Sequence, residues 1–265
     1  MRNLNIAFLF LITWCCYGHA SSVNSQSWNN LLQRYVHVAQ GGSITTVDYA
    51  GMATEARTLH TYLQSTSLVT AHEFNGWSTQ DQLAFLINVY NAWTVDLVLS
   101  RYPNLHSIKD LGSLFVSPWG KAFIPLLGRT VSLDDIEQGL IRGSSRYHEP
   151  RVHFALNCAS QGCPPLRPEA YEGTRLSQQL NDQAIKFLRD RQRNRLQGNI
   201  LQVSSIFKWY GDDFSHGWQG IYSLSGFLAS EASALGLTPT QAQKLRSGSI
   251  TIDFLPYNWQ LNTFR

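Results

Sequence analysis

The sequence predicts an α+β fold, in which a helix-rich single domain surrounds a buried central helix and carries a small, mostly antiparallel sheet. Three observations predict it. Residues 80–100 form one long apolar helical pattern, residues 123–133 alternate like a β-hairpin, and short strand patterns recur near Val152, Leu201 and Ile250. Helices should therefore dominate, and the few strands should form one sheet that packs on the central helix.

The N-terminal part of the domain is expected to be helical. Apolar residues recur at helical spacing over residues 28–39, and Gly41 and Gly42 then end the pattern. A second helix is expected over residues 47–63. The strongest pattern, residues 80–100, begins after the capping Ser78 and is apolar around nearly its whole circumference, which predicts a central, buried helix.

The second half of the chain mixes short strands with helices. Residues 123–127 and 130–133 are expected to pair across a turn at Gly128 and Arg129. Residues 152–156 alternate, which predicts a strand leading into a loop that prolines stiffen. The other expected elements are a short helix over 133–141, mostly helix over 167–193, a strand over 200–204, an aromatic turn or short helix over 206–213, a helix over 224–235 and a closing strand over 250–255.

Composition limits the class of protein. Hydrophobic residues make up 43% of the chain and charged residues 15%, which is a globular balance, and the length suits one domain over residues 21–265. The formal charge of +3 includes Arg2, so residues 21–265 are closer to neutral and lack the basic excess that phosphate-backbone binding needs. Nucleic acid is therefore not the expected partner.

The first twenty residues have the pattern of a cleavable secretory signal. Arg2 supplies a positive start, residues 4–16 are an apolar run, and residues 18–20 form a small-x-small cleavage site ending at Ala20. The apolar run is shorter than the ~20 residues that a bilayer span needs. We therefore expect a periplasmic or secreted protein that does not span the membrane after cleavage, and whose remaining cysteines, Cys158 and Cys163, meet an oxidising compartment.

His153, Cys158 and Cys163 are evenly spaced over the predicted strand and the loop after it, so all three could face one small volume. Three chemistries remain open for them. One cysteine could be a nucleophile whose pKa an imidazolium or a helix N-terminus lowers. The three side chains could instead bind zinc with a fourth ligand, or the two cysteines could form a disulfide that only staples the loop.

Other candidate residues lie nearby in the pattern. Asn88 and Asn91 fall within the buried helix, where an amide either lines a polar binding site or ties loops in place. Glu137 could orient an imidazole or pair with a solvated cation. Trp209 and Tyr210 belong to an aromatic segment that could stack on a sugar ring or fill the core.

Seven segments carry a resemblance to a known family: residues 82–92 (QLAFLINVYNA), 133–137 (LDDIE), 151–160 (RVHFALNCAS), 162–166 (GCPPL), 207–210 (FKWY), 212–214 (DDF) and 254–262 (FLPYNWQLN). With them the chain resembles the family called domain of unknown function 547, and the segment with the histidine and two cysteines is the most specific part of the likeness. The resemblance implies one domain and often an exported bacterial protein, while the family name assigns no activity. Two positions depart from the family pattern: Gln138 stands where a histidine is usual, and Asn258 where an aspartate is usual.

The leading hypothesis is a cysteine-dependent hydrolase or acyltransferase of the cell envelope that needs no cofactor. Cys158 is its nucleophile, His153 its base, and Glu137 or Asn157 the group that orients the histidine. The alternative is a non-enzymatic binding or scaffold protein in which Cys158 and Cys163 are disulfide-bonded and the aromatic segment contacts an envelope partner. A zinc-dependent hydrolase is the third possibility. The expected binding residues are Asn88, Asn91, Cys163, Trp209 and Tyr210.

Overall fold

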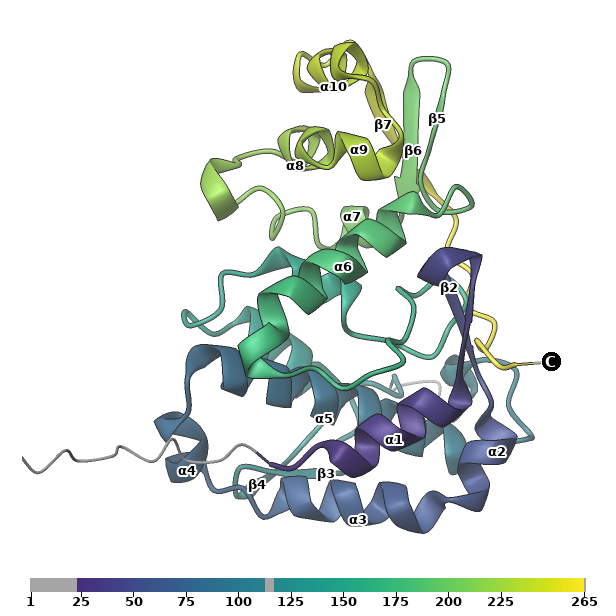
Figure 1. The fold of residues 1–265 in the computed structure, drawn as a ribbon, viewed down its shortest axis with the longest axis vertical. Coiled ribbons are helices and arrows are strands. Elements are labelled where there is room, and N and C mark those ends of the chain that lie inside the picture. Colours follow the sequence, from purple (N-terminus) through teal and green to yellow (C-terminus); the bar gives the residue numbers. More distant parts are fainter. Residues whose placement is uncertain (1–22, 113–116, 265) are drawn as a thin grey trace, which may run out of the picture.

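The structure is a computed structural model that describes residues 23–112 and 117–264. The predicted signal sequence lies outside the described residues. Figure 1 shows helices α1 to α5 in the lower half of the molecule, α6 across its middle, and helices α7 to α10 with a three-stranded sheet above. Helices dominate and the sheets are small, which confirms the predicted α+β class around a buried central helix.

The central helix is α5, and it forms as the sequence predicts. It runs over Thr79–Leu99, and the Ser78 hydroxyl caps it by accepting from the N–H of Asp81. Fourteen of its residues are buried, on every side of the helix. Its length and composition would also suit a membrane span, but 78% of the apolar window is buried within the protein, as in a core helix. Around it lie α1 (Gln26–Tyr35), α2 (Tyr49–Thr54), α3 (Ala56–Ser67) and α4 (Ala71–Gly76).

The N-terminal expectation of two long helices is wrong in detail. Helix α1 ends at Tyr35, and the next four residues form β1 (Val36–Ala39), which pairs antiparallel with β2 (Ile44–Val47). The 3₁₀ turn η1 (Gln40–Gly42) joins the strands, with Gly41 and Gly42 at positive φ. Alternating β-branched residues such as Val36 and Val38 favour a strand over a fourth helical turn. Glu55 separates α2 from α3, so the expected helix over 47–63 is two helices.

The hairpin of β3 (Ile124–Leu126) and β4 (Arg129–Val131) forms where the pattern predicts it, with Gly128 at positive φ in the turn. The following helix, η3 (Asp135–Arg142), is a π-helix whose wider turn buries Ile136, Glu137 and Ile141. This hairpin is a separate two-stranded sheet. The prediction that it joins the later strands in one sheet is therefore wrong.

The strand predicted over residues 152–156 is absent, and a 3₁₀ helix, η4 (Pro150–Phe154), takes its place. Pro150 favours a helical start because its φ is fixed and it needs no N–H partner there. The Glu149 carboxylate caps the turn by accepting from the N–H of Arg151. All five residues of η4 are buried. Because the segment is buried on every side, the alternation of residue types along it does not distinguish a strand from a helix.

The C-terminal part carries a three-stranded sheet. Strand β6 (Ile200–Ser204) lies between β5 (Arg195–Gln197), which is antiparallel to it, and β7 (Thr251–Leu255), which is parallel. Of the region expected to be mostly helical over 167–193, only η5 (Gly173–Arg175) and α6 are helices, and the helix expected over 224–235 is two. The helices of this part are α6 (Leu176–Arg189), α7 (Ile206–Trp209), α8 (Leu224–Ser230), α9 (Ala232–Leu235) and α10 (Pro239–Arg246).

Candidate active site

Cys158 lies in the loop after η4, and the side chain of Asn157 shapes that loop. Asn157 Nδ2 donates to the carbonyl of Pro164 at 2.8 Å, and its Oδ1 accepts from the backbone N–H of Ala159 at 3.0 Å. Ala159 has a φ of +59°, a left-handed conformation that costs a non-glycine residue free energy. Asn157 is thus occupied in holding a strained turn next to Cys158, and it does not contact His153 as an orienting group would.

Two buried amides of α5 anchor the segments on either side of the cysteines. Asn91 Nδ2 donates to the carbonyl of Ala155 at 3.0 Å, and its Oδ1 accepts from the N–H of Asn157 at 2.8 Å. Asn88 pairs in the same way with both backbone groups of Tyr171. These amides satisfy buried loop backbone, which explains their place inside an apolar helix. They hold loops in place rather than line the pocket that contains Cys158.

Two hydroxyl groups lie within hydrogen-bonding distance of the Cys158 sulfur. Its Sγ is 3.1 Å from Tyr257 Oη and 3.2 Å from Ser160 Oγ, and the two hydroxyls are 3.2 Å apart. Cys163 Sγ lies close by and accepts from the backbone N–H of Cys158 at 2.7 Å. Both cysteines are free thiols in the structure. The Cys158 sulfur is therefore surrounded by hydrogen-bond donors that stabilise a negative charge on it.

The two thiols differ in acidity. Burial opposes ionisation of Cys158, but hydrogen bonds from Cys163, Ser160 and Tyr257 outweigh it and lower its pKa to about 7. Burial, and then the neighbouring Cys158, raise the pKa of Cys163 well above its usual value. Burial and the same negative charge also raise the pKa of Tyr257, so its hydroxyl stays a donor. Of the three groups, Cys158 is therefore the one that ionises near neutral pH.

His153 is paired with an acid that sequence analysis did not select. Its Nε2 lies 2.7 Å from Asp213 Oδ2, and the imidazole is buried. Arg142 makes a two-pronged ion pair with the same carboxylate, through Nε at 2.6 Å and Nη2 at 2.9 Å. Although burial opposes ionisation of Asp213, the hydrogen bonds from His153 and Arg142 hold its pKa well below the usual range. Asp213, not Glu137 or Asn157, is the residue that orients His153.

Tyr210 packs flat on His153, with ring centroids 4.0 Å apart and the planes 18° from parallel. The guanidinium of Arg142 lies 4.9 Å from the centroid of the Tyr210 ring. Burial, and then Glu137, raise the pKa of the Tyr210 hydroxyl, which stays protonated at neutral pH. Glu137 therefore interacts with Tyr210 rather than with the imidazole. These contacts fix the plane of His153 from one face and from its edge.

A pocket of about 270 Å³ brings most of the candidate residues together. Its lining includes Cys158, His153, Glu137, Cys163 and the two aromatic residues predicted for binding, Trp209 and Tyr210. Asn88, Asn91 and Asn157 do not line it. The other lining residues are Tyr90, Trp119, Asp134, Leu156, Pro164, Ile206, Tyr257 and Trp259. The arrangement combines a thiolate, an oriented imidazole and two carboxyl groups within a mainly aromatic wall.

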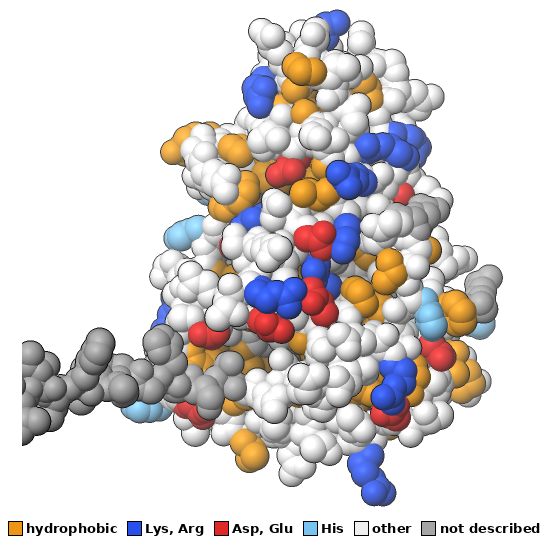
Figure 2. Space-filling view, in the orientation of Figure 1, with side chains coloured by type: hydrophobic (Ala, Val, Ile, Leu, Met, Phe, Trp, Pro, Cys, Tyr) orange, Lys and Arg blue, Asp and Glu red, His pale blue; other side chains and the backbone are white. Residues whose placement is uncertain are grey.

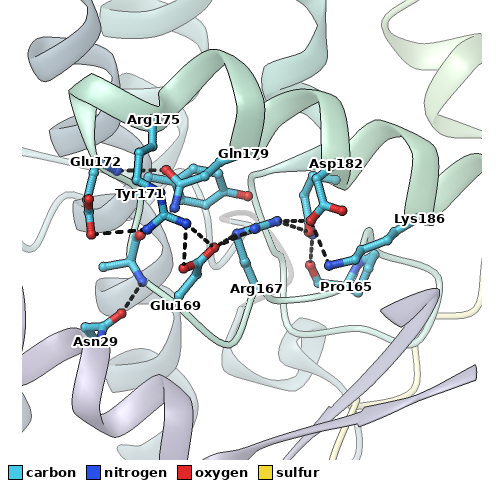
Figure 3. Close-up of polar contacts among 12 residues, drawn as sticks. Asn29, Pro165, Arg167, Glu169, Tyr171, Glu172, Arg175, Gln179, Asp182 and Lys186 are labelled. Carbon is cyan, nitrogen blue, oxygen red and sulfur yellow. Dashed lines mark hydrogen bonds and ion pairs between the residues drawn. The ribbon is translucent and has the colours of Figure 1, made fainter. Parts of the chain in front are cut away.

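A network of charged residues holds the segment after the cysteine loop against α6. Arg167 lies between Glu169 and Asp182, and Lys186 pairs with Asp182 at 2.7 Å (Figure 3). Acidic and basic side chains are interleaved across the middle of the face shown in Figure 2. Ion pairs that share partners in this way fix geometry better than isolated surface pairs do. The network keeps the backbone that follows Pro164 in place.

The zinc alternative has no geometric support in the part of the chain that the structure describes. No group of three or more histidine, cysteine, aspartate or glutamate side chains within residues 23–112 and 117–264 is arranged to hold a metal ion. His153 already uses Nε2 for Asp213, and the Cys158 sulfur is hydrogen-bonded to the hydroxyls of Ser160 and Tyr257. Structural and catalytic zinc sites need three or four converging ligands.

Comparison with known families supports the resemblance seen in the sequence. Residues 74–188 match the family described as Protein of unknown function, DUF547. These matched residues include α5, Glu137, His153 and both cysteines, but the match ends before Asp213 and Tyr257. No curated protein and no solved structure is significantly similar to the chain. The family description assigns no reaction, so the function must be argued from the site.

Sequence reasoning missed three residues that complete the site, namely Asp213, Tyr257 and Ser160. Each lies inside a segment that carries the family resemblance, which was the available signal. The two departures from the family pattern lie at the margin of the site. Gln138 accepts a hydrogen bond from Arg142 on the exposed side of η3, and Asn258 donates to Gln161 on the surface. Neither lines the pocket.

Proposed function

We propose that this protein is a cysteine-dependent hydrolase or acyltransferase, with Cys158 as its nucleophile. One observation carries the proposal: the Cys158 sulfur lies in a pocket where hydrogen bonds from Cys163, Ser160 and Tyr257 lower its pKa to about 7. A thiol with this pKa is about half ionised at neutral pH, which combines a large thiolate fraction with good nucleophilicity. An inert structural cysteine in an apolar site would have a raised pKa instead.

The reaction that fits these groups is acyl transfer through a thioester. The Cys158 thiolate attacks the carbonyl carbon of an ester or amide, and the carbonyl oxygen takes the negative charge. The Tyr257 hydroxyl, released from the sulfur as its charge is lost, donates to that oxygen. The tetrahedral intermediate collapses, the bond to the leaving group breaks, and the leaving group takes a proton from His153. Water, or an acceptor alcohol or amine, then gives its proton to the now neutral His153 as it attacks the thioester carbonyl, and the carbon–sulfur bond breaks to restore the Cys158 thiolate.

In this mechanism Asp213 and Arg142 are positioning residues. Asp213 accepts from His153 Nε2 and stabilises the protonated imidazole, while Arg142 holds the carboxylate in place. The hydrogen bonds of the described residues use only Nε2 of His153, which leaves Nδ1 for proton transfer. Geometry of this kind, with a nucleophile, a histidine and an orienting acid around one pocket, recurs in unrelated acyl-transfer enzymes.

The test is to trap the acyl group on Cys158. The purified chain, incubated with p-nitrophenyl acetate, should release a burst of about one nitrophenolate per chain, and its intact mass should rise by one acetyl group. Cys158→Ser should abolish both signals, whereas Cys163→Ser should retain acetylation at Cys158. Acetylation that persists in Cys158→Ser, or no acetylation of the wild-type chain, would contradict the proposal.

A second candidate function follows from the closeness of the two thiols. Cys163 Sγ accepts from the backbone N–H of Cys158, and the two thiols are themselves hydrogen-bonded, so an oxidant of the envelope compartment could join these neighbours as a disulfide. In that form the chain would be a non-enzymatic binding or scaffold protein whose aromatic surface contacts an envelope partner. Intact mass after alkylation separates the two candidates: label that enters without reductant supports the enzyme, and label that enters only after reduction supports the scaffold.

We place either activity outside the cytoplasm, on a substrate or partner of the cell envelope, because the first twenty residues have the pattern of a cleavable signal. Intact mass of the exported chain tests this as well. A mass that begins at residue 21 supports export and cleavage, and a mass that includes Met1 argues against it.

A further inference from the structure

Apart from the imidazole of His153, the charged groups that line the pocket around Cys158 are all negative. Two carboxylic residues, Asp134 and Glu137, are among its lining residues, whereas no lysine or arginine is. Neither acid takes part in an ion pair among the residues that the structure describes. A thiolate at Cys158 adds a third negative group. Since low-dielectric walls strengthen such fields, an ammonium-bearing ligand would be concentrated here and an anionic ligand excluded.

Glu137 is the more informative of the two acids because it is only 7% exposed. A carboxylate that loses most of its water needs compensating partners. The neighbouring Tyr210 hydroxyl can satisfy one of its oxygens but carries no positive charge, and Arg142, whose charge also acts on Glu137, is paired with Asp213. Burial, and then repulsion from Glu137, raise the pKa of Asp134, so the two acids are close enough to disfavour each other's charge. A cation bound between them would relieve both costs.

The aromatic wall of the pocket suits the same kind of ligand. The ring of Trp259 lies 4.5 Å from that of Tyr257 and 5.8 Å from those of Trp209 and Trp119, measured between centroids. The chain already places one ammonium on this wall, because Lys109 Nζ lies 3.7 Å from the Trp259 centroid. Lys109 is not among the pocket-lining residues. Aromatic rings beside carboxylates are the usual protein environment for binding ammonium groups.

We propose that the substrate of this site is an acyl compound that carries an ammonium group, held by Asp134 and Glu137 and by the aromatic wall around Trp259. The proposal rests on Cys158 as the reactive nucleophile. Recognition places the cation next to the acids and leaves the carbonyl group to reach the sulfur. Neutral or anionic acyl compounds lack the charge that the two acids select, so they bind more weakly.

Two thiol reagents that differ in charge test this proposal without a known substrate. Methanethiosulfonates with a trimethylammonium-ethyl or a sulfonato-ethyl group both transfer their thioalkyl group to a thiolate and release methanesulfinate. The ratio of their rate constants at Cys158, divided by the same ratio for mercaptoethanol, measures charge selection by the pocket. We expect a normalised ratio of about 10 or more, because clefts of one charge raise local counter-ion concentration by about that factor.

Asp134→Asn and Glu137→Gln should each lower the normalised ratio several-fold. Glu73→Gln is the matched control, because Glu73 is an exposed acid on α4, outside the pocket. A normalised ratio near 1 in the wild-type chain, or one that neither pocket variant changes, would overturn the ammonium proposal while the nucleophile stands. Absence of reaction with both reagents would overturn the nucleophile itself, and the substrate class with it. Asp134→Asn keeps the test usable if the buried Glu137→Gln variant does not fold.

Discussion

Replacing Tyr257 with phenylalanine removes one of the hydroxyl donors to the Cys158 sulfur and leaves the ring in place. The hydroxyl lies 3.1 Å from Sγ, and a hydrogen bond to a charged group contributes about 1.5 kcal/mol. That free energy corresponds to about one pKa unit, so the pKa of Cys158 should rise from about 7 to about 8. The thiolate fraction at pH 7 then falls from about one half to about one tenth. Alkylation at this pH should slow about fivefold.

The assay is the rate of iodoacetamide alkylation at Cys158, followed by peptide mass from about pH 5 to about pH 10. The wild-type and Tyr257→Phe profiles should reach similar plateaus at high pH and differ in their midpoints by about one unit. Ser160→Ala should move the midpoint in the same direction. Tyr222→Phe is the control, since Tyr222 is 78% exposed and does not line the pocket. Superimposed wild-type and Tyr257→Phe profiles would refute the reasoning, as would a wild-type midpoint near that of an ordinary thiol.

Three further substitutions test the support of the site. Asp213→Asn should lower the free energy of unfolding at pH 7 by about 1 kcal/mol, allowing for partial solvent exposure. The pKa of Asp213 is depressed in the folded chain, so its contribution to stability is fully present only above the ordinary carboxyl value of 3.8. The difference in unfolding free energy between variant and wild type should therefore shrink as the pH falls below 3.8. Asn91→Ala leaves two buried backbone groups unpaired and should cost about 3 kcal/mol in urea unfolding, while the exposed Asn104→Ala should cost less than about 0.5 kcal/mol. Gln138→Ala removes only an exposed hydrogen bond to Arg142, so the alkylation rate of Cys158 should change less than about twofold, and a larger change would show that this departure from the family pattern matters.

The elements that sequence predicts well are those that carry their own signal. Helix α5 has a capping serine and a long apolar run, and the β3–β4 hairpin has a glycine at its turn. Helix η4 lacks such a signal, because a short, fully buried run has the same composition as a strand. Only the start of η4 carries a local signal, because proline favours the first turn of a helix. The parallel pairing of β6 with β7 joins residues about 50 apart, which no local pattern reports.

The same division holds for the candidate site. His153, Cys158 and Cys163 are close in sequence, and the structure brings all three to one pocket. Asp213 lies 60 residues after His153, and Tyr257 lies 99 residues after Cys158. Spacing along the chain cannot pair residues so far apart. Sequence reasoning therefore assigns the orienting role to Glu137 or Asn157, which are closer to His153 in sequence than Asp213 is, whereas folding supplies the acid from the turn after α7.

The separation of 99 residues between Cys158 and Tyr257 also means that a reactive sulfur exists only in the folded chain. An unfolded copy loses the hydroxyl donor from the C-terminal segment, and its thiol returns to an ordinary pKa near 8.5. Only about 3% of such a thiol is ionised at pH 7, so an unfolded or damaged copy reacts slowly with passing electrophiles. The rate of labelling at Cys158 at neutral pH therefore reports the fraction of a protein preparation that is correctly folded.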